Sequence, residues 1–198
     1  MTKVVVITGG IGSGKTTFSN HLKKLGYLVH ESDQVVSEIY TKPKKQFLRF
    51  IKEKISQNSV TNNKINKLEI KNIIFTNNTK KKLLEKRIHK EVQSSREAFI
   101  KKYTKKKKKI IFADIPLLFE NKLEKRFDTI ICIISSKKNR TKRVLKNKKF
   151  TKENLNKIFK AQTTDKERKK RSQIIINNNK TKKDFIFSVE KVLTRLIK

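Results

Sequence analysis

The chain is poor in the residues that build disulfides and membrane spans. Among its 198 residues there are one cysteine, two prolines, five glycines and no tryptophan. A single cysteine excludes an internal disulfide, and because Cys132 lies in the apolar run 129–134 we expect it to be a packed core residue. No apolar run approaches the length of a membrane span, and a strand pattern begins at once, so we expect no signal peptide and a cytoplasmic location.

Acidic residues are also scarce. The 17 aspartates and glutamates face 52 lysines and arginines, a formal net charge of +35. Such a surplus suggests a nucleic-acid or anionic-membrane partner. The basic residues are, however, spread through nearly every segment, together with abundant asparagine, isoleucine and phenylalanine. Because the codons of these amino acids are rich in A and T, a mutational bias explains the composition as well as selection for a partner does. The densest run, 105–109, leads into an apolar segment and indicates a solvated loop. We therefore expect only non-specific, salt-dependent attraction of polyanions, no specific nucleic acid and no membrane partner.

The few glycines are concentrated, because four of the five fall within residues 8–16, TGGIGSGKT. The spacing G-x-x-x-x-G-K-[ST] of a phosphate-binding loop is met by Gly9, Gly14, Lys15 and Thr16. Glycines let the backbone turn tightly and aim successive N–H groups at phosphate oxygens, and the following helix adds its positive N-terminus. The sequence therefore predicts ATP binding by Gly10, Ile11, Gly12, Ser13, Gly14, Lys15, Thr16 and Thr17.

The surroundings of this loop have the order that phosphate binding requires. Four β-branched residues at 4–7 predict a buried strand, and Phe18, Leu22 and Leu25 recur at helical spacing up to Gly26. Lys15 would reach the β- and γ-phosphates, and the Thr16 hydroxyl would bind Mg²⁺.

Two aspartates follow further strands of the predicted sheet. A strand at 27–29 leads to Asp33, and a strand at 110–113 ends in Asp114. Ligands bind at the carboxyl edge of open parallel sheets, so both carboxylates are candidates for the site. Asp114 would support Mg²⁺, whereas Asp33 either serves the site or caps the next helix.

The remaining pattern is mainly helical. We expect helices throughout 43–103, interrupted by a polar loop at 58–66, and this insertion is a candidate substrate-binding subdomain within one domain, 1–198. His89 accompanies the apolar residues Leu84, Ile88 and Val92, where a satisfied, half-buried histidine is the alternative to a functional one. A fourth strand at 129–134, a lysine-rich lid and its adjoining helix at 146–170, a strand at 174–176 and a terminal helix complete the chain.

These elements predict an α/β fold of the P-loop NTPase class. We expect a three-layer sandwich in which a parallel sheet of about five strands is flanked by helices.

Several strings together resemble the dephospho-coenzyme A kinase family. The loop TGGIGSGKT, Asp33 in ESD, His89 in IHK and the string DIPLLFE at 114–120 match that family, as do Ala161-Gln162, Arg168 and Asn178. The resemblance implies ATP-dependent phosphorylation of the ribose 3′-hydroxyl of dephospho-coenzyme A, with ATP as co-substrate and Mg²⁺ as metal. The oligomeric state of the protein stays open between a monomer and a small homo-oligomer.

The resemblance also implies roles for individual residues. Asp33 would orient the acceptor hydroxyl and take its proton, with Lys15 and Arg143 as the other catalytic residues. Arg143 and Arg168 would bind ATP phosphates, and Asn178 would complete the ATP site. The acceptor pocket would be formed by Asp33, His89, Pro116, Leu117, Leu118 and Glu120.

Some positions depart from the family pattern. The lid arginine of the family is Asn147 here, so its contact is either lost or supplied by Lys146, Lys148 or Lys149. Lys90, Gln173 and Lys180 replace a proline, an aspartate and a glycine of the family. The alternatives to this assignment are another small-molecule or nucleoside monophosphate kinase, and a nucleic-acid-stimulated ATPase.

Overall fold

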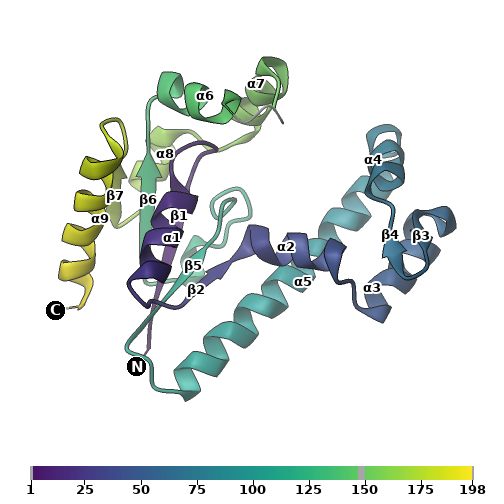
Figure 1. Ribbon diagram of the computed structural model, residues 1–198, viewed down its shortest axis with the longest axis horizontal. Helices are drawn as coiled ribbons and strands as arrows, with labels where there is room; N and C mark the ends of the chain where they lie inside the picture. The colour runs from purple at the N-terminus through teal and green to yellow at the C-terminus, as the bar shows by residue number, and fades with distance from the viewer. Residues whose placement is uncertain (1, 147–149, 198) are drawn as a thin grey trace. The chain divides into compact units, whose positions relative to one another are not determined.

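The computed structural model of the chain describes residues 2–146 and 150–197 (Figure 1). The chain divides into two compact units, each of which is described by itself. One unit comprises Met1–Glu31 and Ile100–Lys198, and the other comprises Ser32–Phe99.

The first unit is built on a five-stranded parallel sheet, as predicted. Its strands, in spatial order, are β2 (Val29–Glu31), β5 (Ile110–Asp114), β1 (Lys3–Gly9), β6 (Thr129–Ile134) and β7 (Ile174–Asn177). All neighbours are parallel, with Ile7 of β1 beside Asp114 and Gly9 beside Ile133. The carboxyl ends of the central strands therefore share one edge, and the strand order reverses at β1, where such sheets bind ligands.

The second strand begins later than the predicted 27–29. Tyr27 instead packs edge-on against Phe112, with ring centroids 5.4 Å apart, so its apolar side chain serves the core before the strand begins.

Helices and a loop cover the two faces of the sheet. Helices α1 (Lys15–Lys24) and α9 (Lys182–Ile197) lie on one face, because Phe18 and Val189 share a buried cluster with Val5 and Ile7. Val6, between those two residues on β1, points to the other face, into a cluster formed largely by residues 113–119. Cys132 is completely buried, as expected for a core residue.

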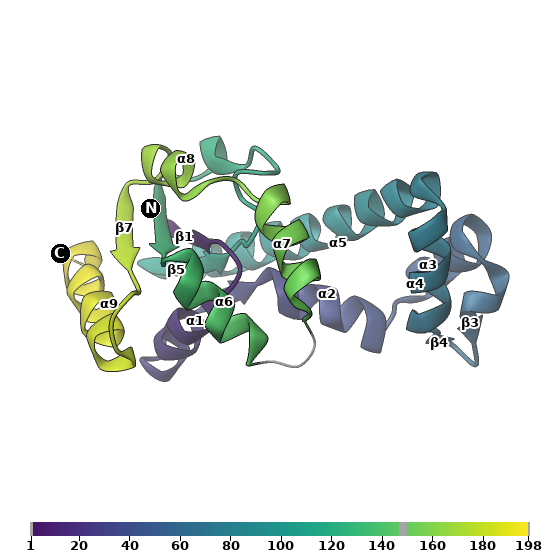
Figure 2. The ribbon, with the colours of Figure 1, turned by 90° about the horizontal axis from the view of Figure 1, so that it is seen from above.

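Further helices lie along the chain between β5 and β7. They are η3 (Glu124–Arg126), α6 (Lys137–Leu145), α7 (Lys152–Ala161) and α8 (Asp165–Lys170). Ser136, Thr151 and Thr164 cap α6, α7 and α8 by accepting a backbone N–H three residues on. Figure 1 shows α6 and α7 beyond the ends of β1 and β6, and Figure 2 shows the two helices side by side.

The second unit is mostly helical. Its elements are α2 (Ser32–Thr41), α3 (Lys45–Phe50), η1 (Ile51–Ile55), η2 (Gln57–Ser59), β3 (Val60–Thr61), β4 (Lys64–Ile65), α4 (Lys67–Thr76) and most of α5 (Asn78–Lys105). They enclose a separate core around Phe47, Ile51 and Leu84. None of the helices within 2–146 and 150–197 is long and apolar enough to cross a membrane.

The polar segment 58–66 does interrupt the helices, but the expectation that it is only a loop was wrong. This segment contains an antiparallel hairpin in which Val60 pairs with Ile65. Asn62 and Asn63 make the turn with φ of 50° and 58°, and asparagine is one of the few residues that enters this left-handed region readily.

Candidate functional site

The phosphate loop connects the end of β1 to the start of α1, as its sequence predicts. Gly14 is the N-cap of α1 with φ of 115°, and a Cβ built on it would lie 2.3 Å from Nδ2 of Asn178. Only glycine fits this position without strain. The N–H groups of the first turn of α1 have no partner within the helix, and together with the helix dipole they form an anion site.

The Lys15 side chain folds back over the beginning of the loop. Its Nζ donates to the carbonyl oxygen of Gly9 at 2.9 Å and lies 3.5 Å from that of Gly10. The ammonium group is therefore held at the loop itself, where lysines of this motif meet the β- and γ-phosphates.

Asp114 lies against α1, on the side from which Thr16 also projects. Its Oδ2 accepts a hydrogen bond from Ser19 Oγ at 3.2 Å, and the side chain is buried. Ser19 follows Thr16 by three positions, so the two hydroxyls share a face of the helix. A hydroxyl and a carboxylate are the hard oxygen ligands that Mg²⁺ takes alongside phosphate and water oxygens, so this pair fits a magnesium ion. Among the described residues there is no cluster of three or more His, Cys, Asp or Glu side chains that could hold a metal alone.

Asn178, which follows β7, and Arg143 of α6 tie the loop to distant parts of the chain. Asn178 Nδ2 donates to the Ser13 carbonyl at 2.7 Å. Arg143 donates to the Asn178 carbonyl at 2.7 Å, and more weakly to the Gly12 carbonyl and to Ser135 Oγ. The predicted contact of Arg143 with ATP remains a prediction.

Arg168 is the most deeply buried cation of the site, with its side chain 1% exposed. Its Nη1 donates to Asp165 Oδ1 at 3.0 Å and its Nη2 to Glu120 Oε1 at 3.2 Å. Glu120 also accepts the Thr163 backbone N–H at 2.8 Å. The glutamate predicted to line the acceptor pocket thus joins the loop after β5 to the segment that precedes α8.

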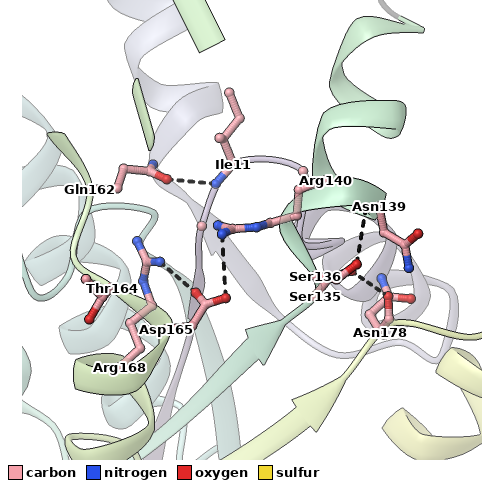
Figure 3. A network of polar contacts seen from close by, with 12 residues as sticks. Ile11, Ser135, Ser136, Asn139, Arg140, Gln162, Thr164, Asp165, Arg168 and Asn178 are labelled. Atoms are coloured by element: carbon pink, nitrogen blue, oxygen red, sulfur yellow. Dashed lines mark hydrogen bonds and ion pairs between the residues drawn. The ribbon is translucent and has the colours of Figure 1, made fainter. Parts of the chain in front are cut away.

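Two side chains from distant parts of the chain lie near the phosphate loop, and the loop sequence itself does not predict them. Gln162 Oε1 accepts the Ile11 N–H at 3.0 Å, and Arg140 of α6 forms an ion pair with Asp165 at 3.6 Å (Figure 3). Burial lowers the pKa of the Arg140 guanidinium, an effect that Asp165 opposes. Sequence reasoning assigned no role to Arg140, Gln162 or Asp165. No local spacing could have found their contacts, because their partners lie far away in the chain.

The residues after β5 differ in exposure. Leu118 is completely buried in the core, whereas Leu117 is 40% exposed and Pro116 is partly exposed. Of the two leucine side chains predicted to contact a substrate, Leu117 is therefore the accessible one.

Asp33 and His89 belong to the second unit. Asp33 is exposed in the first turn of α2. His89 of α5 is exposed beside a surface hollow that Lys82 and Lys86 also line, so the expectation of a half-buried histidine was wrong. The physical reason is helical geometry: the apolar stripe of α5 runs through Leu84 and Ile88, and the next residue is turned away from it.

The structure describes some of the positions that depart from the family pattern, but not all of them. Asn147, Lys148 and Lys149 lie outside the described residues, and Lys146 is exposed just after α6. Gln173, in place of the family aspartate, accepts the Ile130 N–H through Oε1 at 2.9 Å and so joins the start of β7 to β6. Lys90 and Lys180 are exposed.

Known proteins resemble the whole chain. The dephospho-CoA kinase family model matches residues 3–184. The dephospho-CoA kinase of Fusobacterium nucleatum is 32% identical over 191 residues, which cover 95% of each chain. That of Bartonella quintana is 32% identical over 201 residues, which cover 99% of each chain. The solved structure of the dephospho-CoA kinase from Campylobacter jejuni has the same fold, with a TM-score of 0.75 at 24% identity over 99% of this chain and 98% of that one.

Site geometry and sequence similarity agree. The phosphate loop, the carboxylate at the end of β5 and the helices beyond the carboxyl edge of the sheet are parts of a P-loop kinase. The family model spans nearly all of these elements. The chain therefore belongs to the dephospho-CoA kinase family, ATP-using phosphotransferases of coenzyme A biosynthesis.

Proposed function

We propose that this enzyme transfers the γ-phosphoryl group of ATP to the ribose 3′-hydroxyl of dephospho-coenzyme A, giving coenzyme A and ADP. The observation that carries the proposal is a complete phosphate loop, with Lys15 and Asp114 at the same sheet edge, in a chain of this family. The buried free thiol of Cys132 agrees with work in a reducing compartment, the cytoplasm.

The loop and its supports form the donor half of the site. Backbone N–H groups of residues 10–17 would bind the phosphate oxygens, and Lys15 would neutralise charge on the β- and γ-phosphates. Asn178 and Arg143 support the loop from behind through the Ser13 and Gly12 carbonyls, and Arg168 adds a cation nearby. Phosphoryl transfer depends mainly on positioning and charge neutralisation, and these contacts supply both.

Thr16 and Asp114 would hold Mg²⁺. When bound, the ion would neutralise charge on the triphosphate and fix its orientation. Ser19 has a supporting role here, since its hydrogen bond keeps one oxygen of Asp114 directed toward α1.

Asp33 is our candidate for the residue that activates the acceptor. It follows the last residue of β2 by two positions, and β2 ends beside Asp114. Its carboxylate would take the proton of the 3′-hydroxyl while that oxygen forms a bond to the γ-phosphorus and the bond from this phosphorus to the bridging oxygen of ADP breaks. We propose His89, Pro116, Leu117 and Glu120 as residues of the acceptor site, with Leu118 supporting Leu117 from the core.

A panel of acceptors tests the reaction directly. The purified enzyme, ATP and Mg²⁺ are incubated with dephospho-coenzyme A, with nucleoside monophosphates or without an acceptor, and the position of the new phosphate is read by phosphorus NMR. We expect transfer only to the 3′-hydroxyl of dephospho-coenzyme A. Transfer to a nucleoside monophosphate alone, or hydrolysis stimulated by RNA without transfer, would refute the proposal.

The role of Asp33 has a matched test. Asp33→Asn should leave the affinity for ATP nearly unchanged and lower kcat by about 10²- to 10⁴-fold, because the hydroxyl proton then has no acceptor. Glu38→Gln removes another exposed carboxylate of α2 and should leave kcat within about twofold of the wild type. A normal kcat for Asp33→Asn would leave the residue only the role of an acidic side chain in the first turn of α2, where it complements the helix dipole.

A further inference from the structure

The Arg140 guanidinium lies directly against the phosphate loop. A Cβ built on Gly10 would come within 2.2 Å of Arg140 Nη1 and 3.1 Å of Arg168 Nη1. Any side chain larger than hydrogen at position 10 would therefore displace the guanidinium. Arg140 approaches from α6, so the close contact joins two segments that are distant in the chain.

Arg140 stands at the same part of the loop as the Lys15 ammonium. Lys15 Nζ is bonded to the carbonyl oxygens of Gly9 and Gly10, and Arg140 Nη1 fills the space beside Gly10 that a Cβ would occupy. In phosphate loops this lysine serves the β- and γ-phosphates rather than the α-phosphate. Arg140 is thus at the end of the loop where the outer phosphates of a nucleoside triphosphate would lie.

Two contacts hold the Arg140 side chain in place. Asp165 Oδ2 lies 3.6 Å from its Nη2, and the ring of Phe159 on α7 lies beneath the guanidinium, with 4.9 Å between Cζ and the ring centroid. The side chain is only 12% exposed. Figure 3 shows it extending from α6 past the loop backbone toward Asp165, which Arg168 approaches from the other side. This is a positioned cation, unlike the solvated lysines of the surface.

The local charges leave room for an anion. Lys15, Arg140 and Arg168 bring three positive charges to the start of the loop, against the carboxylates of Asp165 and Glu120. Within residues 2–146 and 150–197, Arg140 Nε is buried with no hydrogen-bond partner. A guanidinium whose donors are not all used, beside an excess of positive charge, fits a phosphate oxygen.

We propose that Arg140 binds the γ-phosphate of ATP, held in position by Asp165 and Phe159. This assignment rests on the proposed function for the presence of ATP in the loop, but it does not depend on which acceptor the enzyme uses. Arg140 then differs from Arg143, which lies one turn further along α6 and supports the loop backbone through the Gly12 carbonyl.

Nucleotide binding tests the proposal without the transfer reaction. Dissociation constants for ADP and for a non-hydrolysable ATP analogue, both with Mg²⁺, are measured by calorimetry for the wild type, Arg140→Ala, Arg140→Lys and the control Lys142→Ala. Arg140→Ala should weaken binding of the analogue about 10-fold or more and of ADP less than about twofold, because only the analogue has a γ-phosphate. Arg140→Lys should be intermediate, since lysine keeps the charge without the planar fork.

The outcomes separate the possibilities. Lys142 is an exposed cation of the same helix, so its variant should bind both nucleotides like the wild type. Equal losses for ADP and the analogue in Arg140→Ala would assign Arg140 only to the shape of the loop, and unchanged binding of both would show that it makes no phosphate contact. Either result overturns the proposal. If Arg140→Ala does not fold, Arg140→Gln carries the same comparison. A wild type that binds neither nucleotide would instead refute the proposed function.

Discussion

At the scale of single residues, chemically identical side chains have different surroundings. Arg140 and Arg143 are three positions apart on α6, yet Arg143 is bonded to backbone carbonyls and Arg140 lies between Asp165 and Phe159. The three-residue spacing places both on the side of α6 that meets the loop, but at different heights along the helix. Each arginine therefore meets a different part of the loop.

Cys132 provides a prediction at this scale. Burial raises the pKa of its thiol from 9.0 to about 11 in the folded protein, despite the opposing charge of Arg168. As pH rises through 9 the unfolded chain loses this proton first, so the contribution of the thiol to stability is complete below about pH 9 and is lost by about pH 11. The loss should be about 2–3 kcal/mol.

Urea unfolding at pH 8 and at about pH 11 measures this effect. Cys132→Ala lacks the titrating thiol while keeping every lysine and tyrosine, so the free energy of unfolding should fall more steeply with pH in the wild type than in this variant. Parallel pH dependences in the two proteins would contradict the prediction.

At the scale of elements, the end of β7 controls the shape of the phosphate loop. Asn178 follows β7 directly and contacts the loop at two points. Its amide donates to the Ser13 carbonyl, and the same amide occupies the space beside Gly14 where a larger residue would have a Cβ. Because β7 is at the edge of the sheet and β1 at its centre, this amide joins elements that share no strand pairing.

Asn178→Ala tests this connection. The substitution leaves the buried Ser13 carbonyl without its side-chain donor and removes one acceptor of Arg143, so the free energy of unfolding should fall by about 1–3 kcal/mol. Asn156→Ala, at an exposed position of α7, is the matched control and should change stability by less than about 0.5 kcal/mol. Urea denaturation measures both variants, and equal stabilities would show that the Asn178 bond contributes nothing.

At the scale of the whole molecule, the dominant property is charge. A formal net charge of +35 on 198 residues repels itself in the compact state. The ion pairs of the site are local exceptions, in which Asp165 and Glu120 are among the few acidic residues and each binds a guanidinium.

Salt should therefore stabilise the folded enzyme. Raising NaCl from about 50 mM to about 500 mM shortens the screening length well below 10 Å and weakens this repulsion. We expect Tm to rise by at least about 2–4 °C, the shift that roughly 1 kcal/mol produces in a chain of this size. Differential scanning calorimetry measures Tm, with KCl as a second salt. A constant or falling Tm in both salts would mean that self-repulsion does not limit stability.

The sequence by itself determined the sheet and the phosphate loop. Strand β1 and the loop are predictable because their signals are local: consecutive β-branched residues form a buried strand, and the spacing of glycines, Lys15 and Thr16 is required by a single turn of backbone. The polar hairpin at 60–65 was missed because Asn62 and Asn63 are as typical of a loop as of a hairpin turn. The exposure of His89 was missed because neighbouring residues of a helix point to different faces, so His89 does not share the buried face of Ile88.

Only the tertiary structure decided what surrounds the loop. Gln162 bonds Ile11 across 151 positions, and Arg140 meets Gly10 across the sheet edge. Neither contact has a signature in local spacing, because each depends on how α6, α7 and α8 pack beyond the carboxyl ends of β1 and β6. A phosphate loop is specified by neighbouring residues, whereas the cations around it are selected by the packing of separate elements.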